Sequence, residues 1–180
     1  MKNLTKNKLF LISLLLPIIL LLSMTIKPLV TINYGETVRL QTVPYDPSDL
    51  FYGDYVDLDF EAENIPINSV EKSLRKKLVD NTSGSFSQDR LKAFIQLTYN
   101  KETDTHKLIN ITQTKPKSGI YIKTTLDPYI YEGQVRASIP IEKYYLEDNT
   151  GTLLEDKARK GQLIATIKVR NGYAILRSVE

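Results

Sequence analysis

Cysteine is absent from the sequence of 180 residues, and histidine occurs once, at His106. Without cysteine the chain forms no disulfide framework and no lipid-modified N-terminal cysteine, and a single histidine does not supply the ligand set of an ordinary zinc site. His106, next to Lys107 in a predicted hairpin, is expected at the surface. We therefore predict no metal and no cofactor.

Acidic residues are also missing from the N-terminus, where Lys2, Lys6 and Lys8 precede an apolar run that begins at Leu9. The run ends without the small-residue pattern of a signal-peptide cleavage site, and 9–30 is long enough to cross a bilayer. We predict a transmembrane signal anchor at 9–30 that contacts the lipid bilayer as a single pass. The positive-inside rule then places the basic segment 1–8 in the cytoplasm and a domain of residues 31–180 outside the cell membrane.

No excess of positive charge remains once the anchor is set aside. Residues 32–180 contain 20 basic and 21 acidic residues, a net charge of −1. Binding to nucleic acid through its phosphates calls for a basic surface. The composition therefore argues against a nucleic-acid partner.

Long helical patterns are scarce in 31–180, whereas apolar and polar residues alternate in many short runs, which is typical of strands with one buried face. Asn171-Gly172 and the stretch 101–105 predict hairpin turns. The predicted strands are 37–43, 55–61, 93–100, 106–114, 119–126, 134–141, 161–169 and 173–179.

Two helices are expected among the strands. In 68–80 the spacing of Asn68 and Glu71 suggests a capping box, Glu71 and Arg75 suggest an ion pair, and apolar residues recur four apart. A second helix is predicted at 152–160. The fold class is therefore mainly β: a transmembrane helix followed by an antiparallel β-barrel or sandwich with one or two short helices.

An internal similarity suggests a possible duplication. A strand, an Asp-Pro, an aromatic turn, a glycine and another strand follow each other twice, with Pro47 matching Pro128 and Gly53 matching Gly133. Two such halves could close a small barrel. Asp-Pro and glycine also mark turns in unrelated β-proteins, so the alternative is coincidence of turn signals.

The acid-rich stretch 45–60 is the most distinctive part of the sequence. Its aspartates could act in general acid–base chemistry or hold a hard cation. Alternation instead places Asp57 on the face opposite Val56 and Leu58, and aspartates beside Pro47 and Gly53 suit turns. We favour turn and strand over a catalytic role.

Tyrosines suggest a second role, since rings from both halves could line a groove for a sugar polymer or a peptide. Arg136 could then pair with a carboxylate, either that of Asp54 or one on a ligand. The alternative is that the rings belong to the core and its margin. The candidate binding residues are Asp46, Asp49, Tyr52, Gly53, Asp54, Tyr55, Tyr129, Tyr131 and Arg136.

Residues 53–60, GDYVDLDF, resemble the signature of the GDYXXLXY family of bacterial membrane-associated proteins, with Phe60 in place of the final tyrosine. Tyr52 stands where an arginine is expected. The resemblance extends over most of 34–180. It implies a single-anchor protein with an outer β-domain, often associated with multi-pass membrane proteins, and it brings no established activity.

We therefore predict a membrane-tethered extracytoplasmic accessory or binding domain that docks on a multi-pass membrane protein or an envelope ligand, and not an enzyme. The alternative is an envelope hydrolase. It would use Asp46 and Asp54 as a glycosidase or peptidase does, or Ser23 as the nucleophile of a signal-peptidase-like site. For the second version, the sequence has no lysine-bearing strand motif ahead of Gly53.

Overall fold

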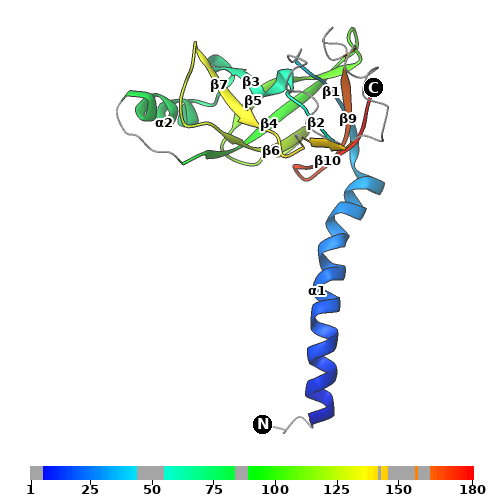
Figure 1. Cartoon of the computed structure of the whole chain (residues 1–180). Helices are drawn as coiled ribbons and strands as arrows, with labels where there is room; N and C mark the ends of the chain where they lie inside the picture. Colours follow the sequence, from blue (N-terminus) through cyan, green and yellow to red (C-terminus); the bar gives the residue numbers. More distant parts are fainter. Residues whose placement is uncertain (1–5, 44–54, 84–88, 142, 146–156, 158–162) are drawn as a thin grey trace.

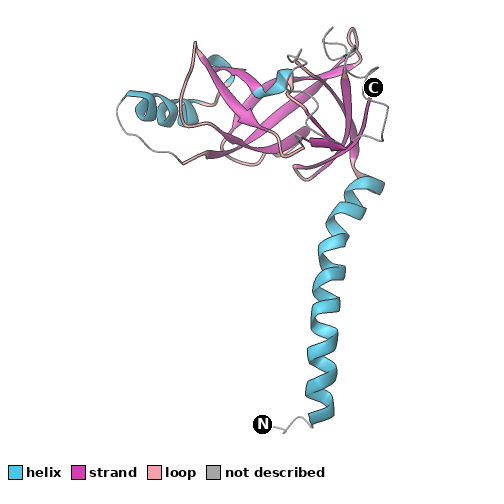
Figure 2. Cartoon of the chain, in the orientation of Figure 1, coloured by secondary structure: helices cyan, strands magenta, loops and turns pink. Residues whose placement is uncertain are grey.

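The computed structural model describes residues 6–43, 55–83, 89–141, 143–145, 157 and 163–180 (Figure 1). A long helix, α1 (Lys6–Tyr34), leaves one side of a domain built mainly of strands (Figure 2). The predicted mainly β class, with an N-terminal apolar helix, is confirmed. Helix α1 is long and apolar enough to cross a membrane, and it lies near the N-terminus. It ends at Tyr34, four residues after the predicted span.

The strands form antiparallel sheets. One has the order β1-β9-β10, a second pairs β2 with β8, and the largest has the order β3-β7-β6-β4-β5. Two single-turn 3-10 helices, η1 (Glu61–Glu63) and η2 (Ile67–Ser69), precede the helix α2 (Lys72–Ser83). The strands are β1 (Glu36–Gln41), β2 (Tyr55–Asp57), β3 (Asn64–Pro66), β4 (Leu91–Asn100), β5 (Thr105–Thr112), β6 (Ile120–Leu126), β7 (Gln134–Ser138), β8 (Lys143–Tyr145), β9 (Ile164–Arg170) and β10 (Tyr173–Val179).

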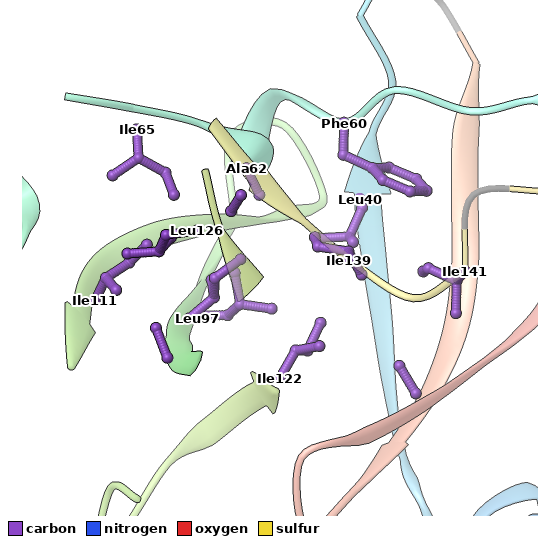
Figure 3. Packing of buried hydrophobic residues seen from close by; sticks show 14 of the residues in the cluster. Leu40, Phe60, Ala62, Ile65, Leu97, Ile111, Ile122, Leu126, Ile139 and Ile141 are labelled. Carbon is purple, nitrogen blue, oxygen red and sulfur yellow. The ribbon is translucent and has the colours of Figure 1, made fainter. Parts of the chain in front are cut away.

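The sheets curl around one apolar core as a half-barrel. Side chains from different sheets meet there, among them Leu40 of β1, Ile122 of β6 and Phe60, all fully buried (Figure 3). Burying each such side chain contributes about 1.5–3 kcal/mol to stability. The alternating pattern that predicted most strands thus corresponds to one face on a shared core.

Two contacts bring the sheets together. The backbone N–H of Arg39 in β1 donates to Nδ1 of His106 in β5 at 3.1 Å. On the other side, the N–H of Lys123 in β6 donates to the carbonyl of Gly172 at 2.8 Å. His106 is therefore only partly exposed, where a surface position was predicted, and its imidazole accepts a hydrogen bond that the edge of β1 would otherwise leave unmade.

The two predicted hairpin turns are confirmed. Asp104, Asn171 and Gly172 have positive φ angles of 51°, 51° and 76°. These are the conformations that tight hairpins require, and Asn-Gly adopts them readily. They join β4 to β5 and β9 to β10.

The start of α2 differs from the predicted capping box. Asn68 lies in η2, and Val70 stays extended because it forms a bridge with Ile111 of β5. The first helical bond runs from the N–H of Arg75 to the carbonyl of Glu71 at 2.9 Å. The predicted face of Val70, Leu74 and Leu78 is buried, as expected.

The predicted Glu71–Arg75 ion pair is also wrong. A carboxylate oxygen of Glu71 accepts from the N–H of Gln113 at 2.8 Å, while Arg75 donates to the carbonyls of Asn68 and Val70. Both side chains satisfy backbone groups beside the helix start, which an exposed pair on one helix would not do.

The predicted strand at 55–61 is shorter than expected. Pairing stops at Asp57, and η1 begins at Glu61 because the Glu63 carboxylate accepts from the N–H of Phe60 at 3.1 Å and folds the chain back. The predicted helix at 152–160 lies outside the described residues, apart from Lys157, which is helical.

The two proposed halves share one local feature. Thr42 forms an antiparallel bridge with Phe60, and Thr125 pairs antiparallel with Ser138. Their neighbours differ, because β1 pairs with β9 whereas β7 lies between β6 and β3. The duplication stays a prediction.

Candidate functional site

The predicted binding residues divide into two groups. Asp46, Asp49, Tyr52, Gly53 and Asp54 lie outside the described residues. The backbone of Tyr55 is in β2 and pairs with Tyr145 of β8. The remaining three, Tyr129, Tyr131 and Arg136, are brought together around one surface hollow.

This hollow has a volume of about 610 Å³ and lies between the β6–β7 connection and β7. We call it the tyrosine–arginine hollow. It is lined by Asn64, Arg90, Asp127, Pro128, Tyr129, Tyr131, Gln134, Val135 and Arg136.

The two tyrosines stand at the rim because of the turn before β7. Glu132 and Gly133 have φ angles of 49° and 76°, and Tyr131 and Gln134 exchange backbone hydrogen bonds of 2.9 Å across the turn. Tyr131 is 76% exposed and Tyr129 is 40% exposed. Two large rings, one of them on this hydrogen-bonded turn, are thus presented to solvent, where they are available for contact.

Both arginines of the hollow are held by carboxylates. Nη2 of Arg136 lies 2.6 Å from Oδ1 of Asp59, which raises the pKa of Arg136, against the opposing effect of partial burial. Nε of Arg90 lies 3.2 Å from Oδ1 of Asp127. Arg136 therefore pairs with Asp59, whereas the predicted partner was Asp54, which lies outside the described residues, or a carboxylate on a ligand.

A second hollow of about 1,030 Å³ adjoins the first, because Arg90 lines both. We call it the basic hollow. Lys92, Phe94 and Lys123 line it from β4 and β6, and Nη1 of Arg90 donates to Oγ of Ser138 at 3.2 Å beside it. Acidic side chains are absent from the described lining of this hollow.

The second half of the motif forms a support for the tyrosine–arginine hollow. Leu58 is 3% exposed and Phe60 is fully buried in the core. Between them, Asp59 points away from the core and reaches Arg136. The final aromatic position of the motif is thus a core position in this chain, which explains why a ring without a hydroxyl is accommodated.

Glu63 is a buried carboxylate that sequence patterns did not identify. It is 3% exposed, and its two oxygens accept from the N–H groups of Phe60 at 3.1 Å and Ile139 at 2.7 Å. It therefore joins η1 to the chain that leaves β7, and the next residue along the chain, Asn64, lines the hollow. Its position immediately after an alternating strand gave no signal of burial.

The residues of the hydrolase alternative are placed as follows. Oγ of Ser23 donates to the carbonyl of Leu20 in its own helix at 2.7 Å, and Nζ of Lys27 lies over the ring of Tyr173. Asp46 and Asp54 lie outside the described residues, which contain no group of three or more histidine, cysteine or acidic residues able to hold a metal ion. The hydrolase alternative stays a hypothesis.

Comparison with known families decides the relationship that the motif suggested. The family profile described as GDYXXLXY protein matches residues 17–179, nearly the whole chain. The chain belongs to the GDYXXLXY family. No curated protein and no solved structure matches it. Within this GDYXXLXY protein, the match covers α1 from Pro17 as well as the β-domain, so helix and domain belong to one family unit.

Proposed function

We propose that this GDYXXLXY protein is a membrane-tethered binding domain, with its N-terminus in the cytoplasm and its β-domain outside, which docks on a multi-pass membrane protein through the tyrosine–arginine hollow. The tether is supported by α1, which is long and apolar enough over residues 8–34 to cross a membrane. The orientation is supported by Lys2, Lys6 and Lys8, which precede the apolar run that begins at Leu9.

The observation that carries the proposal is the exposure of Tyr129 and Tyr131 beside Arg90 and Arg136. Tyrosine and arginine are enriched at the centres of protein interfaces, where rings contribute area and arginines contribute directed hydrogen bonds. A monomer gains little from holding two tyrosines in solvent. A partner surface would cover them.

A membrane protein suits this hollow as partner because the domain follows α1 without a linker. Lys168 of β9 donates to the carbonyl of Gly35, the residue that follows α1, at 3.3 Å. A domain held this close to a bilayer meets the extramembrane loops of neighbouring membrane proteins at high effective concentration. An envelope ligand that is not a protein is the alternative outcome of the test.

The test is capture by the full-length protein carrying a photo-crosslinking residue in place of Tyr131, in cells that produce it. We expect one integral membrane protein to be crosslinked, and the product to be lost in a Tyr129→Ala/Arg136→Gln variant. The matched control places the crosslinker at Ile109, which is 48% exposed on β5 away from the hollow. Equal products from both positions would overturn the proposal.

A second arm addresses the motif. An Asp54→Ala/Tyr55→Ala variant that keeps its circular dichroism spectrum is expected to lose the crosslink if the stretch 45–60 contributes to the same surface. An unchanged crosslink confines the interface to the tyrosine–arginine hollow. Crosslinking of the label to polysaccharide in place of protein would favour an envelope ligand.

A further inference from the structure

The uncharged segment of α1 indicates where a membrane surface would meet this protein. Residues 9–26 are uncharged, and Lys8 and Lys27 flank them. At about 1.5 Å per residue this segment is about 27 Å long, close to the hydrocarbon thickness of about 30 Å. When α1 spans a bilayer, Lys27 therefore lies where hydrocarbon gives way to headgroups.

The domain contacts the helix at that same level. Nζ of Lys27 lies 3.9 Å from the ring centroid of Tyr173, the first residue of β10. Thr31 of α1 is only 2% exposed. Tyr34 lies about one helical turn further along α1, and the guanidinium of Arg170 lies 5.7 Å from its ring. The β9–β10 turn is thus fixed beside the last turns of α1, and a headgroup layer about 5–8 Å deep would reach it.

More cations gather around this turn. Lys123 of β6 packs against Gly172, and Nζ of Lys115 lies 5.7 Å from the ring of Tyr121. Lys117 is exposed in the same β5–β6 connection. We call this set the membrane-facing surface: Lys27, Lys115, Lys117, Lys123 and Arg170, with Tyr34, Tyr121 and Tyr173.

The cations of this surface have no carboxylate partner among the described residues. The salt bridges of the described chain involve Arg39, Arg90 and Arg136. Glu36 is the acidic residue that lines the small hollow of about 260 Å³ between Tyr34, Tyr121 and Arg170. The surface therefore keeps a positive charge although residues 32–180 have a net charge of −1.

Tyr121 adds a separate observation. It is 8% exposed and lines the small hollow, and its buried hydroxyl has no hydrogen-bond partner among the described residues. A buried hydroxyl left without a partner is costly. An acceptor oxygen admitted to this site, such as one of a lipid phosphate, would pair with this O–H.

We propose that the membrane-facing surface binds the headgroups of anionic phospholipids in the leaflet from which the domain emerges. Lysine and arginine within reach of a charged leaflet attract acidic lipids, and tyrosine rings favour the same interfacial depth. The binding holds the domain in one orientation on the bilayer and directs its other faces toward neighbouring proteins. The inference rests on α1 spanning the membrane and is independent of the tyrosine–arginine hollow.

The absence of cysteine makes a depth measurement direct, because each introduced cysteine is unique. Full-length Asn171→Cys and Glu102→Cys variants, labelled with a fluorophore, are reconstituted into liposomes of phosphatidylcholine with or without phosphatidylglycerol. Residue 171 is in the β9–β10 turn, whereas 102 is in the β4–β5 turn on the side of the domain away from α1 (Figure 1). Quenching is measured with a headgroup spin-labelled lipid.

We expect strong quenching at 171, a further increase with phosphatidylglycerol, and little quenching at 102. A Lys115→Gln/Lys117→Gln/Arg170→Gln variant should lose the increase. The matched control is Lys72→Gln/Lys76→Gln/Lys77→Gln on α2, whose lysines are exposed and remote from α1, and it should keep the increase. Equal quenching at 171 and 102, or an increase that survives in the first variant, would overturn the proposal.

Alkaline extraction of the same liposomes separates the two proposals. If the chain is extracted, α1 does not span the bilayer, and both the tether and the lipid-binding surface are rejected. If the chain resists extraction but 171 is not quenched, the lipid-binding surface alone is rejected.

Discussion

In the tyrosine–arginine hollow, Arg136 and Arg90 each lie against a carboxylate, whereas Lys27 and Arg170 at the foot of the domain lie over tyrosine rings. Both regions are built from tyrosines and cations. The aspartates make the difference: they neutralise the hollow and fix its arginines, while the membrane-facing surface keeps its charge. The first arrangement suits a shape-specific partner, and the second suits a layer of many equivalent phosphates.

Glu63→Gln should have the largest effect and should separate the two regions. The amide keeps the shape of the carboxyl but presents an NH₂ group to one of the two backbone donors, Phe60 or Ile139. Leaving such a buried N–H unpaired costs about 1–3 kcal/mol. We expect the free energy of unfolding in urea, followed by circular dichroism, to fall by about 2–3 kcal/mol.

Because Glu63 precedes Asn64, which lines the hollow, and bonds the residue after β7, crosslinking from residue 131 should weaken in this variant while quenching at 171 is unchanged. Glu61→Gln, at an exposed position of the same 3-10 turn, is the control. A Glu63→Gln variant as stable as the Glu61→Gln variant would show that the buried carboxylate does not hold this end of the domain together.

Gly35→Ala tests the opposite region. A Cβ at this position would collide with the backbone carbonyl of Thr31 and lie 3.1 Å from the carbonyl oxygen of Val169. The backbone where α1 packs against β9 must then shift, which should lower the free energy of unfolding by about 1–2 kcal/mol. We expect quenching at 171 to fall, because the β9–β10 turn leaves its place beside Lys27.

Gly133→Ala provides the comparison for that variant. Gly133 has a φ of 76° in the turn that presents Tyr131, and nothing lies within 4 Å of an added Cβ. Backbone strain there should cost about 1 kcal/mol and weaken crosslinking from the hollow without changing quenching at 171. If either glycine variant changes both readouts equally, the two regions are not independent.

His106 lies on the seam between β1 and β5, away from both surfaces, and predicts a pH dependence. Burial lowers the pKa of His106 below its ordinary 6.5, although the carboxylates of Asp104 and Glu36 oppose the shift. Because Nδ1 of His106 accepts a hydrogen bond from the N–H of Arg39, Nδ1 carries no proton and the imidazole is neutral. Since the folded pKa is depressed, the unfolded chain binds the proton first, and stability present above about pH 6.5 is lost as the pH falls toward the folded value.

Unfolding midpoints between pH 5 and pH 8 check this prediction. His106→Ala should cost about 1 kcal/mol at pH 8, where the hydrogen bond is intact, and should flatten the decline below pH 6.5. Lys107→Gln, at the exposed neighbouring position, should leave the decline in place. A decline of equal size in His106→Ala would assign it to other groups.

How much of these regions could be predicted depends on how far apart in the sequence the contacting residues lie. Strands β4 and β9 follow from alternation because each has one face on the core. Strands β3 and β8, of 3 residues each, are too short to show a period. The burial of Glu63 and of His106 depends on partners 76 and 67 residues away, which no local pattern encodes.

The site divides in the same way. Tyr131 and Arg136 could be predicted together because one turn and one strand place them, and the order of strand, turn and strand is visible in the sequence. Arg90 could not, since it precedes β4 and reaches the hollow only because β4 and β7 both flank β6. The predicted carboxylate partner of Arg136 was Asp54 or a ligand, whereas the partner in the described residues is Asp59, which faces Arg136 because β2 ends at Asp57.

Asp59→Asn should have the smallest effect on stability and a distinct effect on function. The Asp59–Arg136 pair is partly exposed, and such pairs contribute about 0–1 kcal/mol, so unfolding should change by less than about 1 kcal/mol. Arg136 would lose the carboxylate that raises its pKa and fixes its guanidinium. The hollow would then resemble the membrane-facing surface, with a mobile and uncompensated cation.

Crosslinking from residue 131 should therefore fall and become sensitive to salt, whereas Asp80→Asn on the exposed side of α2 should change neither. Unchanged and salt-insensitive crosslinking in Asp59→Asn would mean that the tyrosines alone define the interface, and that the carboxylates are not what distinguishes the two regions.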